Sequence, residues 1–360
     1  MPKEKLSLFD CLRVLNSRVV IVSDGAGWVI DNVSLNFKRS LNAKGINSCV
    51  IRRSLLKYFG FLKGKAVFFI DRWAYLDSVN EGFLKKLSIS NKVILTWWHS
   101  GADKNNLELL ESVDRMKKML LYLAIIHVPC SQELDLLKSQ GIEELKIKVV
   151  PEGVEDFFKP CSLREKQQNR KNLNIPEDSF CIGYFQKDGV GWGDGNLPKK
   201  EKGPDIFIET LKCLAKKHNN LFVVLTGPSR GYVKQGLIQA GIPFIHKYLS
   251  DYPDIVKYYS VLDLYLITSR TEGGPKSVLE SMSCGIPVVS TKVGMPIDVI
   301  KDNYNGFLCD IENVQELCDK SERLILDQGL RQQFSKNGLE TVRDFSWDKV
   351  ADIFIEKCLN

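Results

Sequence analysis

The stretch Thr271-Glu-Gly-Gly-Pro-Lys-Ser-Val-Leu-Glu280, continued by Ser-Met-Ser-Cys-Gly-Ile-Pro-Val-Val-Ser290, predicts a loop, a helix and a buried strand in succession. The apolar run Leu262-Asp-Leu-Tyr-Leu266 lies just before it and predicts another strand. Strand, loop, helix and strand form the unit from which parallel α/β sheets are built. Glycines in the loop allow the backbone to approach a ligand closely. The stretch therefore predicts an α/β fold with a ligand site after a strand.

Two carboxylates frame this segment, one in the loop and one a turn into the helix. A carboxylate accepts hydrogen bonds from sugar hydroxyls, and the free amides at a helix N-terminus bind anions such as phosphate. A second interpretation makes Glu272 a plain loop charge and Glu280 a favourable acid in the first helical turn. The residues expected to bind a ligand here are Glu272, Gly273, Gly274, Lys276, Ser277, Val278 and Glu280.

Apolar runs alternate with amphipathic segments along the whole chain, which predicts doubly wound sheets. A chain of 360 residues, 44% apolar and 26% charged, is expected to form two globular domains. Ligands of open α/β sheets bind beyond the carboxyl ends of the strands, so the loops after strands are the candidate sites. The predicted strands include 18–23, 48–51, 66–70, 92–97, 125–128, 180–184, 221–225, 243–245, 262–266 and 287–290.

The segment 271–290 resembles the donor-binding motif of the retaining glycosyltransferases of family 4 (glycosyl transferases group 1), which have the GT-B fold. Three further stretches resemble the same family: Lys148-Val-Val-Pro-Glu-Gly-Val-Glu-Asp-Phe-Phe-Lys-Pro160, Asn303-Tyr-Asn-Gly-Phe-Leu308 and Phe345-Ser-Trp347. The resemblance implies an acceptor-side Rossmann-like domain over 1–155 and a donor-binding one over 156–343. It also implies that a helix over 344–360 returns to the first domain.

The resemblance also implies the roles of several side chains. Glu272 would hold the hydroxyls of the donor sugar, and Glu280 those of the ribose. His99, in Thr96-Trp-Trp-His-Ser-Gly101, would lie beside the donor sugar, although a lone histidine is often structural. The family usually has Gly-Arg and then Lys-Gly; here we assign Lys187 to the arginine position and Lys202 to the lysine position. Both could instead be surface lysines in a flexible loop.

Three other loops carry candidates for nucleotide binding. Gly27 lies in Asp24-Gly-Ala-Gly-Trp28, which follows the first strand and is predicted to lie near the diphosphate; Ile30 replaces the third glycine of a dinucleotide-binding loop. Gly227 and Arg230 follow a later strand and are predicted nucleotide contacts, with a plain tight turn as the alternative. The inserted residues 188–200 would form either a lid over the donor or a simple excursion.

Charge and cysteine content suggest the surroundings of the protein. The net charge of +6 lies wholly in residues 1–155, which hold 23 Lys and Arg against 17 Asp and Glu. The basic segment 52–65 would touch a membrane surface or form an ordinary amphipathic helix. Without a secretory signal at the start, the ten cysteines are expected to be reduced core residues of a cytoplasmic protein. The inner face of the membrane is a second location.

The resemblance implies a hexosyltransferase that uses a nucleotide-diphosphate sugar and a glycan or lipid-linked acceptor, as in polysaccharide biosynthesis. The resemblance implies retention of anomeric configuration. No D-x-D pair occurs, so we expect no metal and no further cofactor. We expect no nucleic-acid partner. The alternatives are a nucleotide-sugar epimerase of the same fold and a non-catalytic protein that binds nucleotide sugars.

Overall fold

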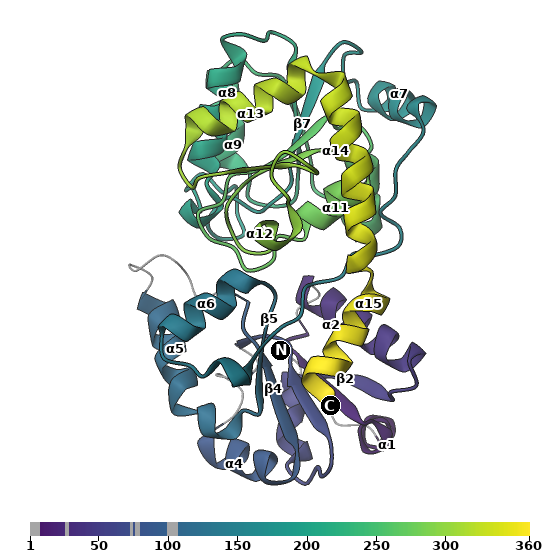
Figure 1. Cartoon of the computed structure of the whole chain (residues 1–360), viewed down its shortest axis with the longest axis vertical. Helices are drawn as coiled ribbons and strands as arrows, with labels where there is room; N and C mark the ends of the chain where they lie inside the picture. Colours follow the sequence, from purple (N-terminus) through teal and green to yellow (C-terminus); the bar gives the residue numbers. More distant parts are fainter. Residues whose placement is uncertain (1–7, 26–28, 73–74, 76–79, 99–106) are drawn as a thin grey trace. The chain divides into compact units, whose positions relative to one another are not determined.

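The computed structural model describes residues 8–25, 29–72, 75, 80–98 and 107–360 (Figure 1). The chain divides into two compact units. The first unit comprises Met1–Gly153 and Trp347–Asn360, and the second comprises Val154–Ser346. The sequence places its domain boundaries after residues 155 and 343, a few residues from these divisions.

The first unit is built on a six-stranded sheet in which every neighbouring pair of strands is parallel. The strand order is β2-β1-β3-β4-β5-β6. The strands are β1 (Val19–Ser23), β2 (Ser48–Arg52), β3 (Ala66–Phe69), β4 (Lys92–Thr96), β5 (Ile125–Val128) and β6 (Ile147–Val149). Its helices are α1 (Leu8–Asn16), α2 (Val29–Ala43), α4 (Glu81–Ser90), α5 (Leu107–Lys118), α6 (Ser131–Ser139) and α15 (Trp347–Phe354).

Both faces of this first sheet are covered. Val20 and Val22 of β1 belong to one apolar cluster, whereas Val19 and Ile21 belong to another. Alternate residues of a strand point to opposite faces, so a strand buried on both sides must be apolar throughout. This explains why the sequence shows continuous apolar runs and no alternation.

The C-terminal helix α15 belongs to the first unit, as the sequence predicts. Its Phe354 packs against Phe37 of α2 and Phe68 of β3, with ring centroids 5.1 and 4.7 Å apart. Trp347 lies so close to Gly153 that a Cβ on that glycine would stand 2.5 Å from the indole ring. The segment Phe345-Ser-Trp347 thus leads into α15, which begins at Trp347 and whose apolar face completes the core on one side of the sheet.

The second unit repeats the plan with a second parallel six-stranded sheet, ordered β12-β11-β10-β7-β8-β9. The strands are β7 (Phe180–Tyr184), β8 (Leu221–Thr226), β9 (Phe244–Lys247), β10 (Leu264–Ile267), β11 (Val288–Thr291) and β12 (Phe307–Cys309). The helices are α7 (Leu163–Asn172), α8 (Pro204–Ala215), α9 (Gly231–Gln239), α10 (Ile255–Tyr259), α11 (Ser277–Ser283), α12 (Pro296–Val299), α13 (Val314–Leu326) and α14 (Gln328–Thr341).

Helices flank the second sheet on two sides. In Figure 1, α8, α9 and α13 lie together on one side of β7, and α11 and α14 lie together on the other. Two six-stranded parallel sheets with helices around them confirm the predicted α/β architecture.

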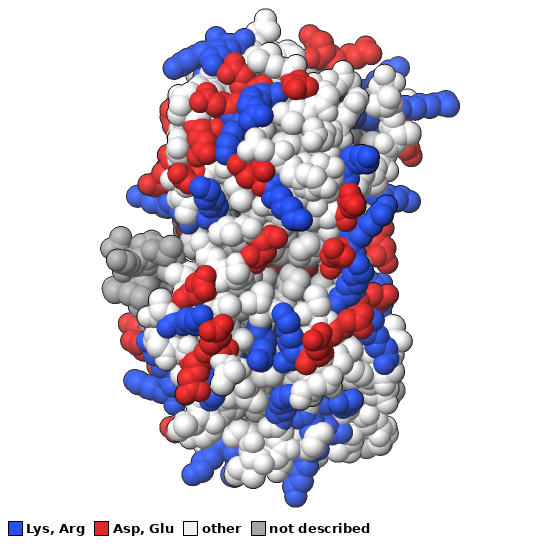
Figure 2. Space-filling view, in the orientation of Figure 1, with Lys and Arg blue, Asp and Glu red and all other residues white. Residues whose placement is uncertain are grey.

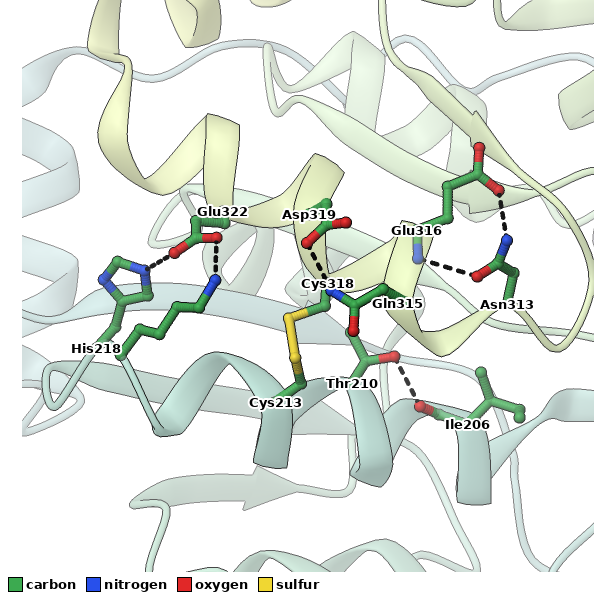
Figure 3. Close-up of a disulfide and its surroundings, with 11 residues drawn as sticks. Ile206, Thr210, Cys213, His218, Asn313, Gln315, Glu316, Cys318, Asp319 and Glu322 are labelled. Atoms are coloured by element: carbon green, nitrogen blue, oxygen red, sulfur yellow. Dashed lines mark hydrogen bonds and ion pairs between the residues drawn. A yellow bond between two sulfur atoms is a disulfide. The ribbon is translucent and has the colours of Figure 1, made fainter.

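One pair of cysteines corrects the expectation that all ten are reduced. Cys213 of α8 and Cys318 of α13 form a disulfide (Figure 3). The two helices pack side by side. Just beyond the end of α8, Lys217 Nζ lies 2.7 Å from a carboxylate oxygen of Glu322 in α13. No short-range motif could reveal this bond, because its partners are 105 residues apart. Cys49, Cys130 and Cys284 are not part of this disulfide and are buried, as expected.

The basic segment 52–65 forms a 3-10 helix, η1 (Arg53–Phe59), followed by a turn. Leu56 and Phe59 are buried in the first unit, while Tyr58 and Phe61 are exposed. On the face drawn in Figure 2, acidic side chains lie among the basic ones over both units. Contact of this segment with a membrane stays a prediction. None of the helices in the described part of the chain is long and apolar enough to cross a bilayer.

Candidate active site at the carboxyl edge of the second sheet

The second sheet has a point at which the chain reverses its direction of winding. From β7 the chain proceeds to β8 and β9 on one side, and it then returns to β10, which pairs with β7 on the other side. The loops that leave the carboxyl ends of β7 and β10 therefore diverge there. Such a switch point is where open α/β sheets bind ligands.

Side chains from these two loops meet at the switch point. Lys202 ends the 3-10 helix η4 (Lys200–Lys202), and its Nζ lies 2.6 Å from each carboxylate oxygen of Glu272. Ser269 donates a hydrogen bond to Glu272 Oε1 at 3.0 Å. The structure thus brings together two predicted catalytic residues, Lys202 and Glu272, which are 70 residues apart in the chain.

The backbone around Lys202 explains why it points toward the β10 loop. Gly203 has φ of 62°, and a Cβ there would lie 1.9 Å from the carbonyl oxygen of Thr268. Only glycine fits this left-handed conformation at such close approach. The Thr268 hydroxyl donates to the Gly203 carbonyl at 2.8 Å, and α8 begins at once with Pro204. The Lys-Gly pair is therefore fixed to the end of β10 through its backbone.

The predicted glycine loop lies directly against another turn. The carbonyl oxygen of Gly273 accepts a hydrogen bond from the Met295 amide at 2.9 Å. A Cβ on Gly294 would stand 2.5 Å from the carbonyl oxygens of Glu272 and Gly273. Gly274 is half-buried beside them. This packing fixes the backbone of the loop that carries Glu272.

The short helix α11 begins with the remaining residues of the motif. The Val278 amide donates to the carbonyl of Pro275 at 3.0 Å, so it is engaged within the start of the helix. Lys276 is buried, and its Nζ lies 2.6 Å from Glu155 Oε1. Ser277 is half-buried at the first helical position. The predicted anion site over 276–278 therefore carries an internal ion pair that the sequence does not indicate.

Glu280 is held deep in the same region. Its carboxylate accepts hydrogen bonds from the Tyr252 hydroxyl and, at 2.7 Å, from the Tyr259 hydroxyl. Burial raises the pKa of Glu280 above its ordinary value, while the nearby Lys276 charge and the two tyrosine hydrogen bonds act in the opposite direction. Glu280 is thus a buried acceptor whose two tyrosine partners sequence reasoning missed, and its predicted contact with a ribose stays a prediction.

The inserted residues 188–200 are tied down along their length. Ser229 donates to the carbonyls of Gly191 and Gly193 at 3.0 and 3.1 Å. The amides of Gly231 and Tyr232 donate to the carbonyls of 194 and 195 at 2.6 and 2.9 Å. The insertion therefore docks on the start of α9 in this structure, and movement of the loop as a lid stays a prediction.

Arg230 also holds the inserted loop 188–200 in place, through an ion pair with Asp188. The guanidinium is buried, donates to the carbonyl of Tyr184 at 2.6 Å and lies 3.2 Å from a carboxylate oxygen of Asp188. Burial raises the pKa of Asp188 to about 6, against the opposing charge of Arg230. Gly227 has φ of 84° at the preceding turn, and its carbonyl accepts from His246 Nε2 at 2.8 Å. The predicted nucleotide contacts of Gly227 and Arg230 stay predictions.

Lys187 lies at the start of the same loop, over an aromatic ring. Its Nζ is 3.7 Å from the ring centroid of Trp192, a cation–π contact. Burial, followed by the charge of Lys199, lowers the pKa of Lys187. Trp192 remains 60% exposed. Lys187 is thus paired with Trp192 in this structure. Its contact with the diphosphate stays a prediction.

Two predicted residues, Gly27 and His99, lie outside the described residues. The neighbouring Trp97 and Trp98 are described: Trp97 is fully buried, and Trp98 Nε1 donates to the carbonyl of Ile70 at 2.9 Å. Sequence reasoning also missed five residues that hold the site in the second unit. They are Glu155, Gln186, Tyr252, Tyr259 and Ser269. The position of Ser269 two residues after the end of β10 is the local signal that could have revealed it.

The architecture defines an α/β protein of the two-sheet GT-B type, and solved structures share it. Anabaena Alr3699/HepE, solved in complex with UDP and glucose, aligns with a TM-score of 0.71 at 16% identity, covering 95% of this chain and 99% of that one. Sucrose-phosphate synthase from Thermosynechococcus elongatus aligns with a TM-score of 0.74, also at 16% identity, covering 95% and 98%.

Residues 195–341 match the family model described as glycosyl transferases group 1. This match lies in the second unit, which is therefore similar to that family over those residues. A relative in Corynebacterium jeikeium, a D-inositol 3-phosphate glycosyltransferase, is 28% identical over 242 residues, which are 63% of this chain and 55% of the relative. The capsular polysaccharide biosynthesis glycosyltransferase CapM of Staphylococcus aureus is 22% identical over 68% of this chain and 67% of its own length. The chain spans about half the length of the first curated relatives it matches.

Proposed function

We propose that the protein transfers a sugar from a nucleotide-diphosphate sugar to an acceptor hydroxyl, and that the donor binds at the switch point of the second sheet. The observation that carries the proposal is the contact between Lys202 and Glu272, which joins the β7 and β10 loops there. A cation suits a diphosphate, and a carboxylate suits sugar hydroxyls. The match of residues 195–341 to the model of glycosyl transferases group 1 supports the same chemistry.

The two side chains keep bonding capacity for a donor. A lysine ammonium has three N–H donors, and Lys202 directs two of them at Glu272. The third is available for a diphosphate oxygen, where it would stabilise the negative charge of the leaving group. An ionised carboxylate has about four acceptor positions. Glu272 receives Lys202 twice and Ser269 once, so one position remains for a sugar hydroxyl.

The rest of the donor would follow the motif toward α11. Gly273 and Gly274 let the backbone approach the sugar and phosphates. Ser277 adds a polar group at the start of the helix, and Glu280 would accept from the ribose. Lys187 would supply a second cation once its contact with Trp192 is exchanged for the diphosphate. His99, whose role the resemblance implies, and Gly27 are the other residues that we expect to bind the donor.

The finer points of the reaction belong to the same proposal. With retention, the bond from the anomeric carbon to the diphosphate breaks and the bond to the acceptor oxygen forms on the same face. The acceptor proton passes to the departing diphosphate, so neither a protein nucleophile, a metal nor a cofactor is needed. The names of relatives favour a phosphorylated, glycan or lipid-linked acceptor: one acts on an inositol phosphate, another on a diphospho-undecaprenol sugar.

The proposal is tested by incubating the protein with UDP-glucose, UDP-N-acetylglucosamine and GDP-mannose and measuring nucleotide release and product. We expect one donor to be turned over, and Glu272→Gln to weaken its binding by roughly 10- to 100-fold, since a hydrogen bond to a charged group is lost. Glu312→Gln is the matched control, because Glu312 is 61% exposed and pairs only at the surface with Arg270. Isomerisation of the donor without an acceptor would indicate an epimerase, and binding without turnover a non-catalytic protein.

A further inference from the structure

Glu280 is embedded among hydroxyl donors and rings. It is 5% exposed on α11, and each of its carboxylate oxygens accepts a hydrogen bond from a different tyrosine. Tyr259 is fully buried and reaches Oε2, whereas Tyr252 is half-buried and reaches Oε1. Tyr252 is therefore the more exposed of the two donors.

The ring of Tyr252 is held in place independently of its hydroxyl. Tyr252 begins the 3-10 helix η5 (Tyr252–Asp254) and contacts Phe157 and Phe158 edge to face, with centroids 5.6 and 5.8 Å away. The Lys276 ammonium lies 5.5 Å from its ring centroid. Because three neighbours fix the ring, the hydroxyl has a defined direction toward Glu280.

The number of acceptor positions on Glu280 suggests what this arrangement achieves. An ionised carboxylate offers about four acceptor positions, two on each oxygen. The two tyrosines occupy one position on each oxygen. One position on each oxygen remains, which matches the two neighbouring hydroxyls of a ribose.

We propose that Tyr252 is a positioning residue for the nucleotide: together with Tyr259 it orients the Glu280 carboxylate so that each oxygen keeps one acceptor position for a ribose hydroxyl. This inference rests on the proposed function, in which Glu280 binds the ribose. Tyr252 acts through Glu280 and need not touch the nucleotide. It thereby determines selectivity for a ribonucleotide over a 2′-deoxyribonucleotide.

Loss of the Tyr252 hydroxyl should also change the pH at which the protein loses its affinity for the nucleotide. Burial already raises the pKa of Glu280, and the hydrogen bonds from Tyr252 and Tyr259 counteract that rise. Tyr252→Phe removes one of them, so the folded protein should lose nucleotide affinity at a higher pH as acid is added. A merely structural role for the tyrosine would not move this midpoint.

The test is isothermal titration of UDP, 2′-deoxy-UDP, GDP and 2′-deoxy-GDP into the wild type and Tyr252→Phe between pH 5 and 8. We expect Tyr252→Phe to bind the preferred ribonucleotide roughly tenfold more weakly, with a smaller loss for its 2′-deoxy form and a higher acid midpoint. Tyr248→Phe is the matched control, because Tyr248 is 70% exposed in the same unit. Tyr248→Phe should leave the affinity for the ribonucleotide, the affinity for its 2′-deoxy form and the acid midpoint unchanged.

A double-mutant cycle keeps the inference open to refutation if the first variant loses stability. If Tyr252 acts through Glu280, adding Tyr252→Phe to Glu280→Gln should cost almost no further affinity. Additive losses, or an unchanged preference for ribose in Tyr252→Phe, would overturn the role of Tyr252. If the wild type binds neither UDP nor GDP, the proposed function fails instead, so the two failures are distinct.

Discussion

The two units share a sheet plan but differ in what lies at the carboxyl ends of the strands. In the second unit, charged and polar side chains from the β7 and β10 loops bond to one another at the switch point. In the described residues of the first unit, Trp97 and Trp98 follow β4 and turn toward the core and the backbone. The comparison teaches that one sheet plan can carry loops of different character: the β7 and β10 loops bond to each other through charged side chains, whereas the residues after β4 pack inward.

The largest effect is expected from the core of the first unit. Phe354→Ala removes a fully buried ring that packs on Phe37 and Phe68, and it should lower the free energy of unfolding of that unit by about 3–5 kcal/mol. Urea unfolding followed by tryptophan fluorescence reports mainly on this unit, because Trp192 is the one tryptophan of the second.

Leu326→Ala is the control for this experiment, because Leu326 is 72% exposed on the second unit and its loss should change stability by less than about 0.5 kcal/mol. Nucleotide affinity of folded Phe354→Ala should match the wild type. A loss of nucleotide affinity as large as the loss of stability would contradict the view that the core of the first unit and the nucleotide site act independently.

The next effect concerns the cation of the site. Lys202→Met removes the ammonium that faces Glu272 and should reduce turnover by about 10²–10³-fold, since it loses charge stabilisation of the leaving diphosphate. Lys292→Met is matched to it, because Lys292 follows a strand of the same sheet but forms an exposed pair with Asp310. Steady-state rates of nucleotide release compare the two. Equal rates of nucleotide release for the two variants would contradict a role for Lys202 in the active site.

A smaller effect should distinguish the two units through the disulfide. The double variant Cys213→Ser, Cys318→Ser should lower the free energy of unfolding of the second unit by about 2–4 kcal/mol and leave the first unit unchanged. Dithiothreitol should destabilise the wild type by a similar amount and have no effect on the variant. If a reductant destabilises both proteins equally, the bond between α8 and α13 is not the cause.

The smallest effect is on how the free energy of unfolding depends on pH, which should have opposite signs in the two units. His127 is buried in the first unit, and desolvation lowers its pKa from 6.5 to about 4, so its contribution to stability is lost as the pH falls through that window. Asp188 in the second unit has its pKa raised from 3.8 to about 6, so its contribution is lost as the pH rises between those values.

Urea unfolding at several pH values between 4 and 7 tests both signs. Substituting His127→Gln should flatten the profile of the first unit, and Asp188→Asn that of the second. Profiles with the same slope in both units would contradict the assignment of these two buried groups.

The fold was predictable because its signals are local. Apolar runs of five or six residues, each followed by a helical segment, determine parallel strands covered on both faces. Glu272, Glu280 and the Lys-Gly pair at 202 could also be located, since each follows a strand or opens a helix. The parallel sheet then brings residues together that are 70 positions apart.

The partners of these residues could not be predicted, because each contact joins distant segments. Lys276 meets Glu155 across 121 residues, and Glu280 meets tyrosines 21 and 28 residues away. The sequence predicts that Arg230 contacts the nucleotide, but it does not show that Arg230 is buried beside Asp188 of the inserted loop. The disulfide was missed for the same reason, since nothing near Cys213 in the sequence points to Cys318.

The most direct measurement is a crystal structure of the protein grown with the nucleoside diphosphate that binds most tightly. The account predicts that the β-phosphate lies within hydrogen-bonding distance of Lys202 Nζ and that the ribose hydroxyls meet Glu280, at the edge where β7 and β10 end. A nucleotide bound elsewhere, with Lys202 and Glu272 still closed on each other and remote from it, would contradict the account.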